Sequence, residues 1–225
     1  MELTVVIPAY NEESTIKQTV EEINRHILKA RILIINDGSK DKTLNIIKKL
    51  KSKHKNLDFI SHDKNRGYGA ALITGFLKSK TPYVAFLDAD LTYHPRYIPL
   101  LLDLVKRQDL DCAWGNRFGG KKNKMPFIRK IGNRALVFLF LLVVGRYVKD
   151  VSCGERIFTK EALNKIDFGT LPNGLDMITA MTKRIVKRKL KFKLIPIEYF
   201  ERRGSSKLNV MRDFINMTKN ILAEK

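Results

Sequence analysis

The strongest constraint on the fold is a regular alternation of short apolar segments with longer mixed ones over the first 115 residues. Apolar runs separated by helical segments of about 10–15 residues are typical of βαβ units on a parallel sheet. The expected strands are Leu3–Pro8, Arg31–Asn36, Leu57–Ser61, Tyr83–Leu87 and Leu110–Gly115. The expected helices are Ser14–Leu28, Asp41–Lys53, a segment from the Gly67-Tyr68-Gly69 turn through Leu77, and Pro95–Lys106. We therefore expect an α/β fold with a mostly parallel central sheet flanked by helices.

The pattern changes after Asn116. Gly119–Lys124 predicts a flexible loop, because two glycines are followed there by three lysines and an asparagine. The further expected elements are helices at Arg134–Arg146, Leu175–Lys189 and Val210–Leu222, a turn at Asp150–Arg156 and a strand at Phe192–Tyr199. No internal repeat or linker divides the chain, so we expect one domain over 1–225, with halves of about 1–115 and about 116–225.

Three aspartates follow the expected strands directly. Asp37 comes after the second strand, and Asp88 and Asp90 come after the fourth. Ligands of parallel α/β sheets bind beyond the carboxyl ends of the strands. Two neighbouring carboxylates raise each other's pKa, and a hard cation such as Mg²⁺ or Mn²⁺ relieves the repulsion and can bridge to a diphosphate. An isolated Asp-x-Asp is as readily a surface turn, but the buried strand before this pair favours a metal site.

The charge balance indicates an anionic partner. Lys and Arg number 43 against 23 Asp and Glu, which gives a formal net charge of +20. Nucleic acid, phosphate-bearing substrates and an acidic membrane surface all fit, and so does general solubility. No nucleic-acid-binding motif is present, and Leu72 replaces the third glycine of a dinucleotide fingerprint. We therefore expect no nucleic-acid partner.

Cellular location is constrained by what the sequence lacks. Cys112 and Cys153 have neither zinc-site nor disulfide-framework spacing, so we expect reduced core cysteines in a cytoplasmic protein. The N-terminus runs directly into a strand, and we expect no signal peptide. The longest apolar run, Ala135–Val144, is about half of the ~20 residues that cross a bilayer, so we expect no transmembrane helix.

Four ordered segments resemble glycosyltransferase family 2: Val5–Glu13, Ile34–Thr43, Asn65–Ala71 and Phe86–Asp90. The resemblance implies a GT-A (Rossmann-like) fold, inversion at the anomeric carbon, and a nucleotide-sugar donor held by the first half. Carried over, the implied donor-binding residues are Pro8, Tyr10, Glu12, Ile35, Asp37, Asp88, Ala89, Asp90, Arg117 and Arg129. The implied ligands of Mg²⁺ or Mn²⁺ are Asp90 and Thr92.

The second half resembles dolichyl-phosphate mannose synthases and polyprenyl-phosphate glucose synthases, through Gly115–Phe118, Arg129–Arg134, Asp150–Arg156 and Arg202–Leu208. This implies transfer of mannose from GDP-mannose, or glucose from UDP-glucose, to dolichyl or polyprenyl phosphate. A phosphate monoester has a second pKa of about 6, so it attacks without a general base but needs cations to hold it. The implied catalytic residues are Asp88, Asp90, Arg117, Arg202 and Lys207.

Several alternatives stay open. Thr92 stands where many mannose synthases have Gln, which leaves the sugar undecided, and Arg202 and Arg203 compete for one role. Cys153 and Glu155 stand where relatives have Ser and an aromatic residue. A family member that glycosylates a sugar hydroxyl would need a base, for which Asp176 is the candidate.

Two apolar segments could lie at a membrane interface. One is Leu136–Val144 between Arg134 and Arg146, and the other is the face of the last helix that carries Val210, Phe214, Met217 and Ile221. Core or subunit packing is the slightly favoured explanation for each segment taken separately. The expected location is peripheral, on the cytoplasmic face of an anionic membrane, with a membrane protein or a second copy of the chain as possible partner.

Overall fold

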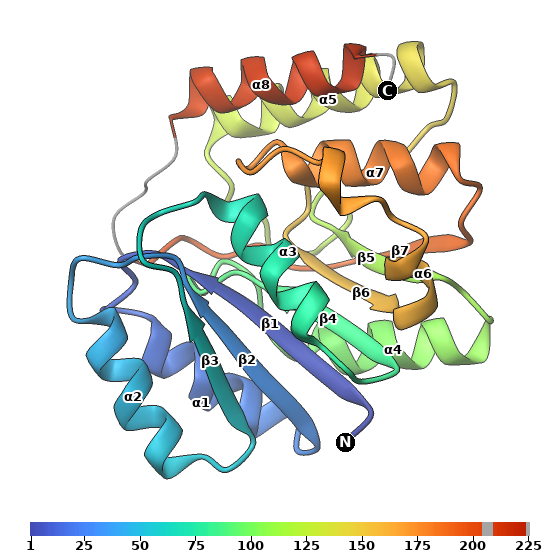
Figure 1. Ribbon diagram of the computed structural model, residues 1–225. Helices are drawn as coiled ribbons and strands as arrows, with labels where there is room; N and C mark the ends of the chain where they lie inside the picture. Colours follow the sequence, from blue (N-terminus) through green and yellow to red (C-terminus); the bar gives the residue numbers. More distant parts are fainter. Residues whose placement is uncertain (204–208, 224–225) are drawn as a thin grey trace.

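Seven strands form one sheet in the order β3-β2-β1-β4-β6-β5-β7 (Figure 1). The computed structural model describes residues 1–203 and 209–223. The strands are β1 (Leu3–Ala9), β2 (Ala30–Asn36), β3 (Leu57–Ser61), β4 (Tyr83–Leu87), β5 (Cys112–Asn116), β6 (Glu155–Thr159) and β7 (Phe192–Pro196). The helices are α1 (Ile16–His26), α2 (Thr43–Lys53), α3 (Tyr68–Lys78), α4 (Tyr97–Arg107), α5 (Phe127–Val144), α6 (Lys160–Asn164), η1 (Phe168–Thr170), α7 (Met177–Lys187) and α8 (Val210–Leu222).

The strand directions confirm the predicted, mostly parallel sheet. β1 pairs in parallel with β2 and with β4, β2 with β3, and β5 with β7. Only β6 runs antiparallel, between β4 and β5. The expected turn at Asp150–Arg156 was wrong at its end, because Glu155 and Arg156 already belong to β6. Their charged side chains hid the strand in the sequence, although both are fully buried.

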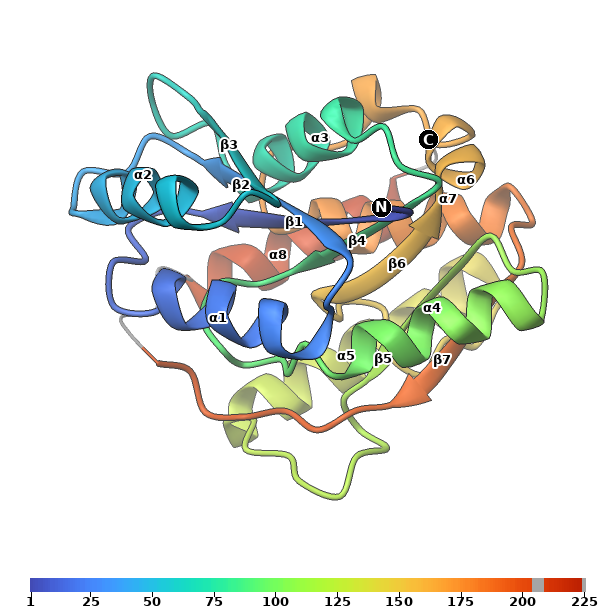
Figure 2. The same cartoon turned by 90° about the horizontal axis from the view of Figure 1, so that it is seen from below.

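Helices cover both faces of the sheet (Figure 2). α1 and α4 lie on one face and α3 on the other. The largest fully buried apolar side chains include Trp114, Phe76, Phe86, Phe140 and Phe158. Burying side chains of this size contributes about 1.5–3 kcal/mol each, and this core fixes the strand ends that carry the polar residues.

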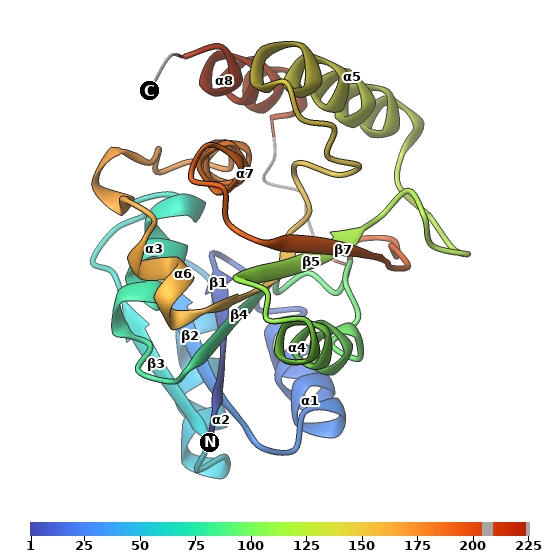
Figure 3. The same ribbon diagram turned by 90° about the vertical axis from the view of Figure 1, so that its right-hand side faces the viewer.

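A further helical layer lies beyond α7. Figure 3 shows α5 and α8 side by side, with α7 between them and the sheet. α5 begins at Phe127, seven residues before the expected start, and contains Gly132. A Cβ at Gly132 would lie 3.6 Å from the ring of Phe214 on α8, which is ordinary van der Waals contact, so the two helices pack closely here without requiring glycine. Within 1–203 and 209–223, no helix is both long and apolar enough to span a membrane.

The strand ends that carry the three aspartates meet at one edge of the sheet, as expected. In the parallel register Ala9 pairs with Asn36, and Val6 pairs with Phe86. The segments that follow β1, β2 and β4 therefore leave the sheet at the same edge. Cys112 and Cys153 are free and buried in the core, as the sequence indicated.

Candidate functional site

A cavity of about 820 Å³ opens at this edge of the sheet. One end is polar and is formed by the segments after β1, β2 and β4. The other end is largely apolar and is formed by α5, α8 and the start of α7. Of the expected donor-binding residues, the lining includes Pro8, Tyr10, Glu12, Asp37, Asp88, Ala89, Asp90, Arg117 and Arg129. Ile35 is not among them, because its side chain is fully buried in β2, where it packs in the core.

Asp37, in the cavity lining, is held in place by three hydrogen-bonding groups. One carboxylate oxygen lies 2.7 Å from Nδ1 of His62 and accepts the backbone N–H of Arg66 at 2.9 Å. The other oxygen accepts the N–H of Gly67 at 2.9 Å. A carboxylate has about four acceptor positions, so Asp37 can still accept a hydrogen bond from a ligand. Gly67 has φ +104°, and a Cβ there would clash with the carbonyl oxygen of Asn173 at 2.3 Å.

Asp88 points into a closely fitted space at the end of β4. The hydroxyl of Tyr68 donates to its Oδ1 at 2.6 Å. On the other side, a Cβ at Gly154 would lie 2.5 Å from Oδ2, so only glycine leaves room for this carboxylate. Burial, followed by the charge of Asp90, raises the pKa of Asp88 to about 7. The carboxylate therefore favours a neighbouring cation.

Asp90 is oriented by its own loop. Thr92 donates to its Oδ1 from both the backbone N–H, at 3.0 Å, and the hydroxyl, at 2.6 Å. Leu91 between them adopts φ +61°, a left-handed conformation that is unfavourable for a residue with a branched side chain. Strain of this kind persists where the surrounding structure fixes it, often at functional sites.

Arg202 supplies a cation to the same end of the cavity. Its guanidinium donates to Oε1 of Glu12 at 2.9 Å and lies 3.3 Å from Oδ2 of Asp90. The backbone holds it there, because the N–H of Arg203 donates to the carbonyl oxygen of Asp90 at 3.2 Å. The side chain of Arg203 instead bonds Gln18 at the surface. Of the two competing arginines, the structure therefore brings Arg202 to the site. Lys207, which was also expected to be catalytic, lies outside the described residues.

Arg117 has a different setting from the one expected. Its guanidinium forms two 2.7 Å bonds to the carboxylate of Asp150 and one of 2.8 Å to the hydroxyl of Ser152. The Arg117 side chain is 7% exposed and that of Asp150 1%. Because the carboxylate already compensates its charge, Arg117 is better suited to fixing the cavity wall than to holding a phosphate.

The family model described as Glycosyl transferase family 2 matches residues 4–167. The chain belongs to this family. It is a glycosyltransferase.

Several relatives of this glycosyltransferase match over nearly their whole length. An uncharacterized protein of Methanocaldococcus jannaschii is 33% identical over 98% of this chain and 91% of its own. The UDP-N-acetylglucosamine–dolichyl-phosphate N-acetylglucosaminyltransferase of Methanococcus voltae is 31% identical over 93% of this chain and 91% of its own. A dolichyl-phosphate hexose transferase of Haloferax volcanii is 30% identical over 92% of this chain and 87% of its own.

Solved structures confirm the GT-A fold. Glucosyl-3-phosphoglycerate synthase from Mycobacterium tuberculosis, in complex with phosphoglyceric acid, superposes with a TM-score of 0.76 at 19% identity. It covers 98% of this chain and 78% of its own. The same enzyme in complex with Mn²⁺, uridine diphosphate and phosphoglyceric acid gives a TM-score of 0.73 at 17% identity. At this identity the likeness shows the fold alone.

The polar end of the glycosyltransferase cavity suits a divalent cation. Three of its acidic groups, Glu12, Asp88 and Asp90, lie near Arg202 and offer only oxygen, which Mg²⁺ and Mn²⁺ prefer. The guanidinium of Arg202 already bridges Glu12 and Asp90, which shows that positive charge is stabilised there. Such ions commonly take one or two carboxylates and complete their shell with substrate phosphates and water. The residues present therefore fit the metal.

Sequence reasoning missed three residues that position the acids. Tyr68 was noted only as part of a turn, although its hydroxyl reaches Asp88. Gly154 was noted only as part of a motif, and His62 not at all. Each lies far along the chain from the acid that it contacts. The glycines within the matched segments were the only available signal, since a glycine often marks a close approach.

Proposed function

We propose that this glycosyltransferase moves a hexose from a nucleotide diphosphate donor to dolichyl or polyprenyl phosphate, with inversion at the anomeric carbon. The observation that carries the proposal is the cavity itself. Its polar end has four acidic side chains and Arg202, and its apolar end includes Ile128, Ile131, Leu136, Val210, Phe214 and Met217. A soluble acceptor needs no apolar end, whereas a lipid phosphate needs both.

The donor binds at the polar end in this proposal. Pro8 and Tyr10 pack against the nucleotide base, and Asp37 accepts a hydrogen bond from it. Asp90, with Asp88 beside it, holds Mg²⁺ or Mn²⁺, which neutralises charge on the diphosphate when bound. Thr92 orients Asp90 through its 2.6 Å hydrogen bond, and its hydroxyl can also serve as a metal ligand.

The acceptor phosphate lies between the two ends. Arg202 has a buried Nε without a hydrogen-bond partner among the described residues, so it keeps a donor for an anionic oxygen. Arg129, from the first turn of α5, lines the same cavity. An oxygen of the lipid phosphate attacks the anomeric carbon in line, while the bond from that carbon to the nucleotide diphosphate breaks. This single displacement inverts the configuration of the carbon. The phosphate is already ionised near neutral pH, so no protein base is required.

The cavity fits a sugar hydroxyl less well as the acceptor group. Such an acceptor needs a base, and Asp176 was the candidate. Its carboxylate instead accepts a 2.5 Å hydrogen bond from Asn220 and is not part of the cavity lining. The relatives from Methanococcus voltae and Haloferax volcanii, which are named for transfer to dolichyl phosphate, also support a lipid phosphate.

We further propose that α5 and α8 attach the protein to the cytoplasmic face of an anionic membrane. Most exposed large apolar side chains of the described residues lie on these helices, including Ile128, Phe138 and Leu142 on α5 and Met211 on α8. Exposed apolar patches mark interaction surfaces, and the net charge of +20 favours anionic lipids. The apolar end of the cavity opens between the same two helices, where a lipid acceptor would arrive.

Acceptor competition tests the proposal. The purified protein is given Mn²⁺ and radiolabelled GDP-mannose, UDP-glucose or UDP-N-acetylglucosamine, with either a short polyprenyl phosphate or a glycan acceptor. We expect transfer to the lipid phosphate, with a loss of at least about a hundredfold in Asp90→Asn. Asp63→Asn is the matched control, because the Asp63 side chain is 99% exposed. Transfer only to glycan hydroxyls would refute the acceptor assignment.

A further inference from the structure

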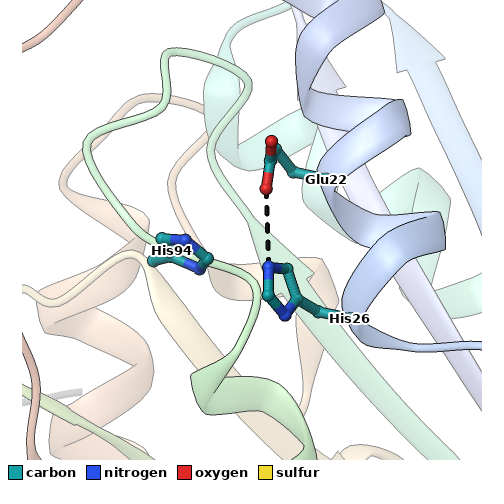
Figure 4. Close-up of side chains that lie close together, drawn as sticks. All are labelled: Glu22, His26 and His94. Carbon is teal, nitrogen blue, oxygen red and sulfur yellow. Dashed lines mark ion pairs between the residues drawn. The ribbon is translucent and has the colours of Figure 1, made fainter.

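A second group of metal-binding side chains lies outside the cavity, where α1 meets the loop after β4. Glu22 and His26 are one helical turn apart on α1, and His94 comes from the loop that leads from Thr92 to α4 (Figure 4). One ligand atom of each residue lies within 4.8 Å of the other two. Within the ranges 1–203 and 209–223, no other three His, Cys, Asp or Glu side chains converge in this way.

The three side chains already face one another. Nε2 of His26 lies 3.5 Å from Oε2 of Glu22. The rings of His26 and His94 meet edge to face, with centroids 4.7 Å apart. The other oxygen of Glu22 accepts from Arg25 at 2.5 Å, which fixes the carboxylate and leaves Oε2 turned to His26. All three residues are partly buried, so they are accessible to an ion yet restricted in movement.

Two imidazoles and one carboxylate form a donor set that suits Zn²⁺ and related transition metals, whereas Mg²⁺ prefers oxygen alone. In a tetrahedral zinc site with bonds near 2.1 Å, ligand atoms are about 3.4 Å apart. From separations of at most 4.8 Å, the ligand atoms therefore need to close by no more than about 1.4 Å. Side-chain rotation accomplishes this, and water completes the shell.

Metal binding would replace one weak interaction. The backbone N–H of Arg96 donates to Nδ1 of His94 at 3.2 Å. A metal on Nδ1 takes that lone pair, and a metal on Nε2 moves the ring proton to Nδ1, so either mode breaks this hydrogen bond. The bond is at the long end of the normal range, so its loss subtracts little from the free energy of zinc binding.

We propose that Glu22, His26 and His94 form a zinc site, separate from the donor site, that fastens the loop carrying Asp90 and Thr92 to α1. α1 already contacts this loop, because the hydroxyl of Thr19 donates to the carbonyl oxygen of Ala89 at 2.9 Å. A metal bridge from α1 to His94, two residues after Thr92, adds a second attachment at the far end of the loop. The inference holds whichever sugar and acceptor the enzyme uses.

Zinc binding to the full-length, chelator-treated protein tests the site. Calorimetric titration with ZnCl₂, in buffer containing Mg²⁺, is expected to show one saturable zinc per chain. His26→Gln and His94→Gln are each expected to weaken binding by about tenfold or more. His54→Gln is the matched control, since His54 follows α2 and bonds Asn24 away from the cluster. Asp90→Asn is expected to retain zinc, because it removes only the donor-site ligand.

A spectroscopic readout separates ligation from a change in folding. Co²⁺ in place of zinc is expected to give a visible absorption band typical of a low-coordinate nitrogen–oxygen site. The band should be absent in His94→Gln, whose circular dichroism should match that of the wild type. The proposal is overturned if no saturable zinc binds, if Mg²⁺ displaces the zinc, or if both histidine variants bind zinc as the wild type does.

Discussion

At the scale of single residues, the protonation of Asp88 is expected to control how strongly the proposed donor site binds a divalent cation. Burial and the neighbouring Asp90 raise the pKa of Asp88 to about 7, and the hydroxyl of Tyr68 partly offsets this rise. Below that pH a proton competes with the metal for the carboxylate. Mn²⁺ affinity is therefore expected to fall by about tenfold per pH unit below 7 and to level off above it. Titrations over a pH series measure this.

The variant Tyr68→Phe sharpens this test. It removes the hydrogen bond that lowers the pKa of Asp88, so the fall in Mn²⁺ affinity should begin at a higher pH than in the wild type. An affinity that does not change between about pH 6 and pH 8 in either protein would contradict the proposed role of Asp88.

Glu155 predicts that the folded state becomes less stable as the pH rises. It is fully buried, and neither carboxyl oxygen has a hydrogen-bond partner among the described residues. Burial, reinforced by Asp88, raises the pKa of Glu155 well above its usual range. As pH rises past about 4 the unfolded chain releases this proton while the folded chain keeps it, so the folded state loses stability.

Glu155→Gln removes this titration. Relative to the wild type, the variant should gain unfolding free energy as the pH is raised from 4 to 8, because glutamine has no proton for the unfolded chain to release. Urea denaturation at both pH values measures the gain. A difference between the two proteins that is the same at both pH values would show that Glu155 does not titrate in this way.

The acids could be predicted from the sequence, but their partners could not. Asp37, Asp88 and Asp90 directly follow apolar strands, and parallel strands bring their ends together. Tyr68 and Arg202 meet these acids only through tertiary packing, which no local pattern records. Arg117 was assigned to phosphate because its partner Asp150, 33 positions away, could not be identified from the chain.

At the scale of elements, the segment that leads into β6 forms part of the wall at the polar end of the cavity, through Ser152 and Gly154. Leu87 at the end of β4 pairs with Glu155 at the start of β6, so Gly154 lies against Asp88. This strand escaped prediction because two of its five residues are charged yet buried. α5 was predicted too short, since Gly132 and neighbouring polar residues interrupt the apolar periodicity that defined the helix.

Gly154→Ala tests the role of this wall. The new methyl group would lie 2.5 Å from Oδ2 of Asp88 and displace the carboxylate. We expect at least about tenfold weaker Mn²⁺ binding with the fold retained. Gly169→Ala is a matched control, because its Cβ would meet only Asp167, at 3.4 Å. Equal Mn²⁺ affinity in both variants would remove Gly154 from the site.

At the scale of the whole molecule, the α5–α8 layer and the net charge predict membrane attachment. Phe138 and Leu142 are 62% and 65% exposed and lie one turn apart on α5, outside the cavity lining. Replacing both with serine should weaken co-sedimentation with anionic liposomes by about tenfold or more. Activity on a detergent-solubilised acceptor should persist.

Leu100→Ser, on the exposed surface of α4, is the control for this experiment, since Leu100 is 56% exposed and lies on another helix. The attachment should also weaken as salt is raised, because ionic screening reduces the attraction to anionic lipid. Liposome binding that is unchanged by the double substitution would assign the exposed faces of α5 and α8 to another partner.

The sheet and its functional edge followed from the alternation of apolar and helical segments, whereas the α5–α8 layer did not. Each of these helices was expected, with core, subunit and membrane packing left open. Only the tertiary structure places α5 and α8 side by side at the apolar end of the cavity.

The stereochemistry of the product tests the central claim most directly. The protein is incubated with Mn²⁺, an α-linked nucleotide diphosphate hexose and a short polyprenyl phosphate, and the organic-phase product is analysed by NMR. We predict a polyprenyl phosphate hexose with a β-linkage at the anomeric carbon. A product of retained α-configuration would contradict single displacement, and an organic phase without any polyprenyl phosphate hexose would contradict a lipid phosphate as the acceptor.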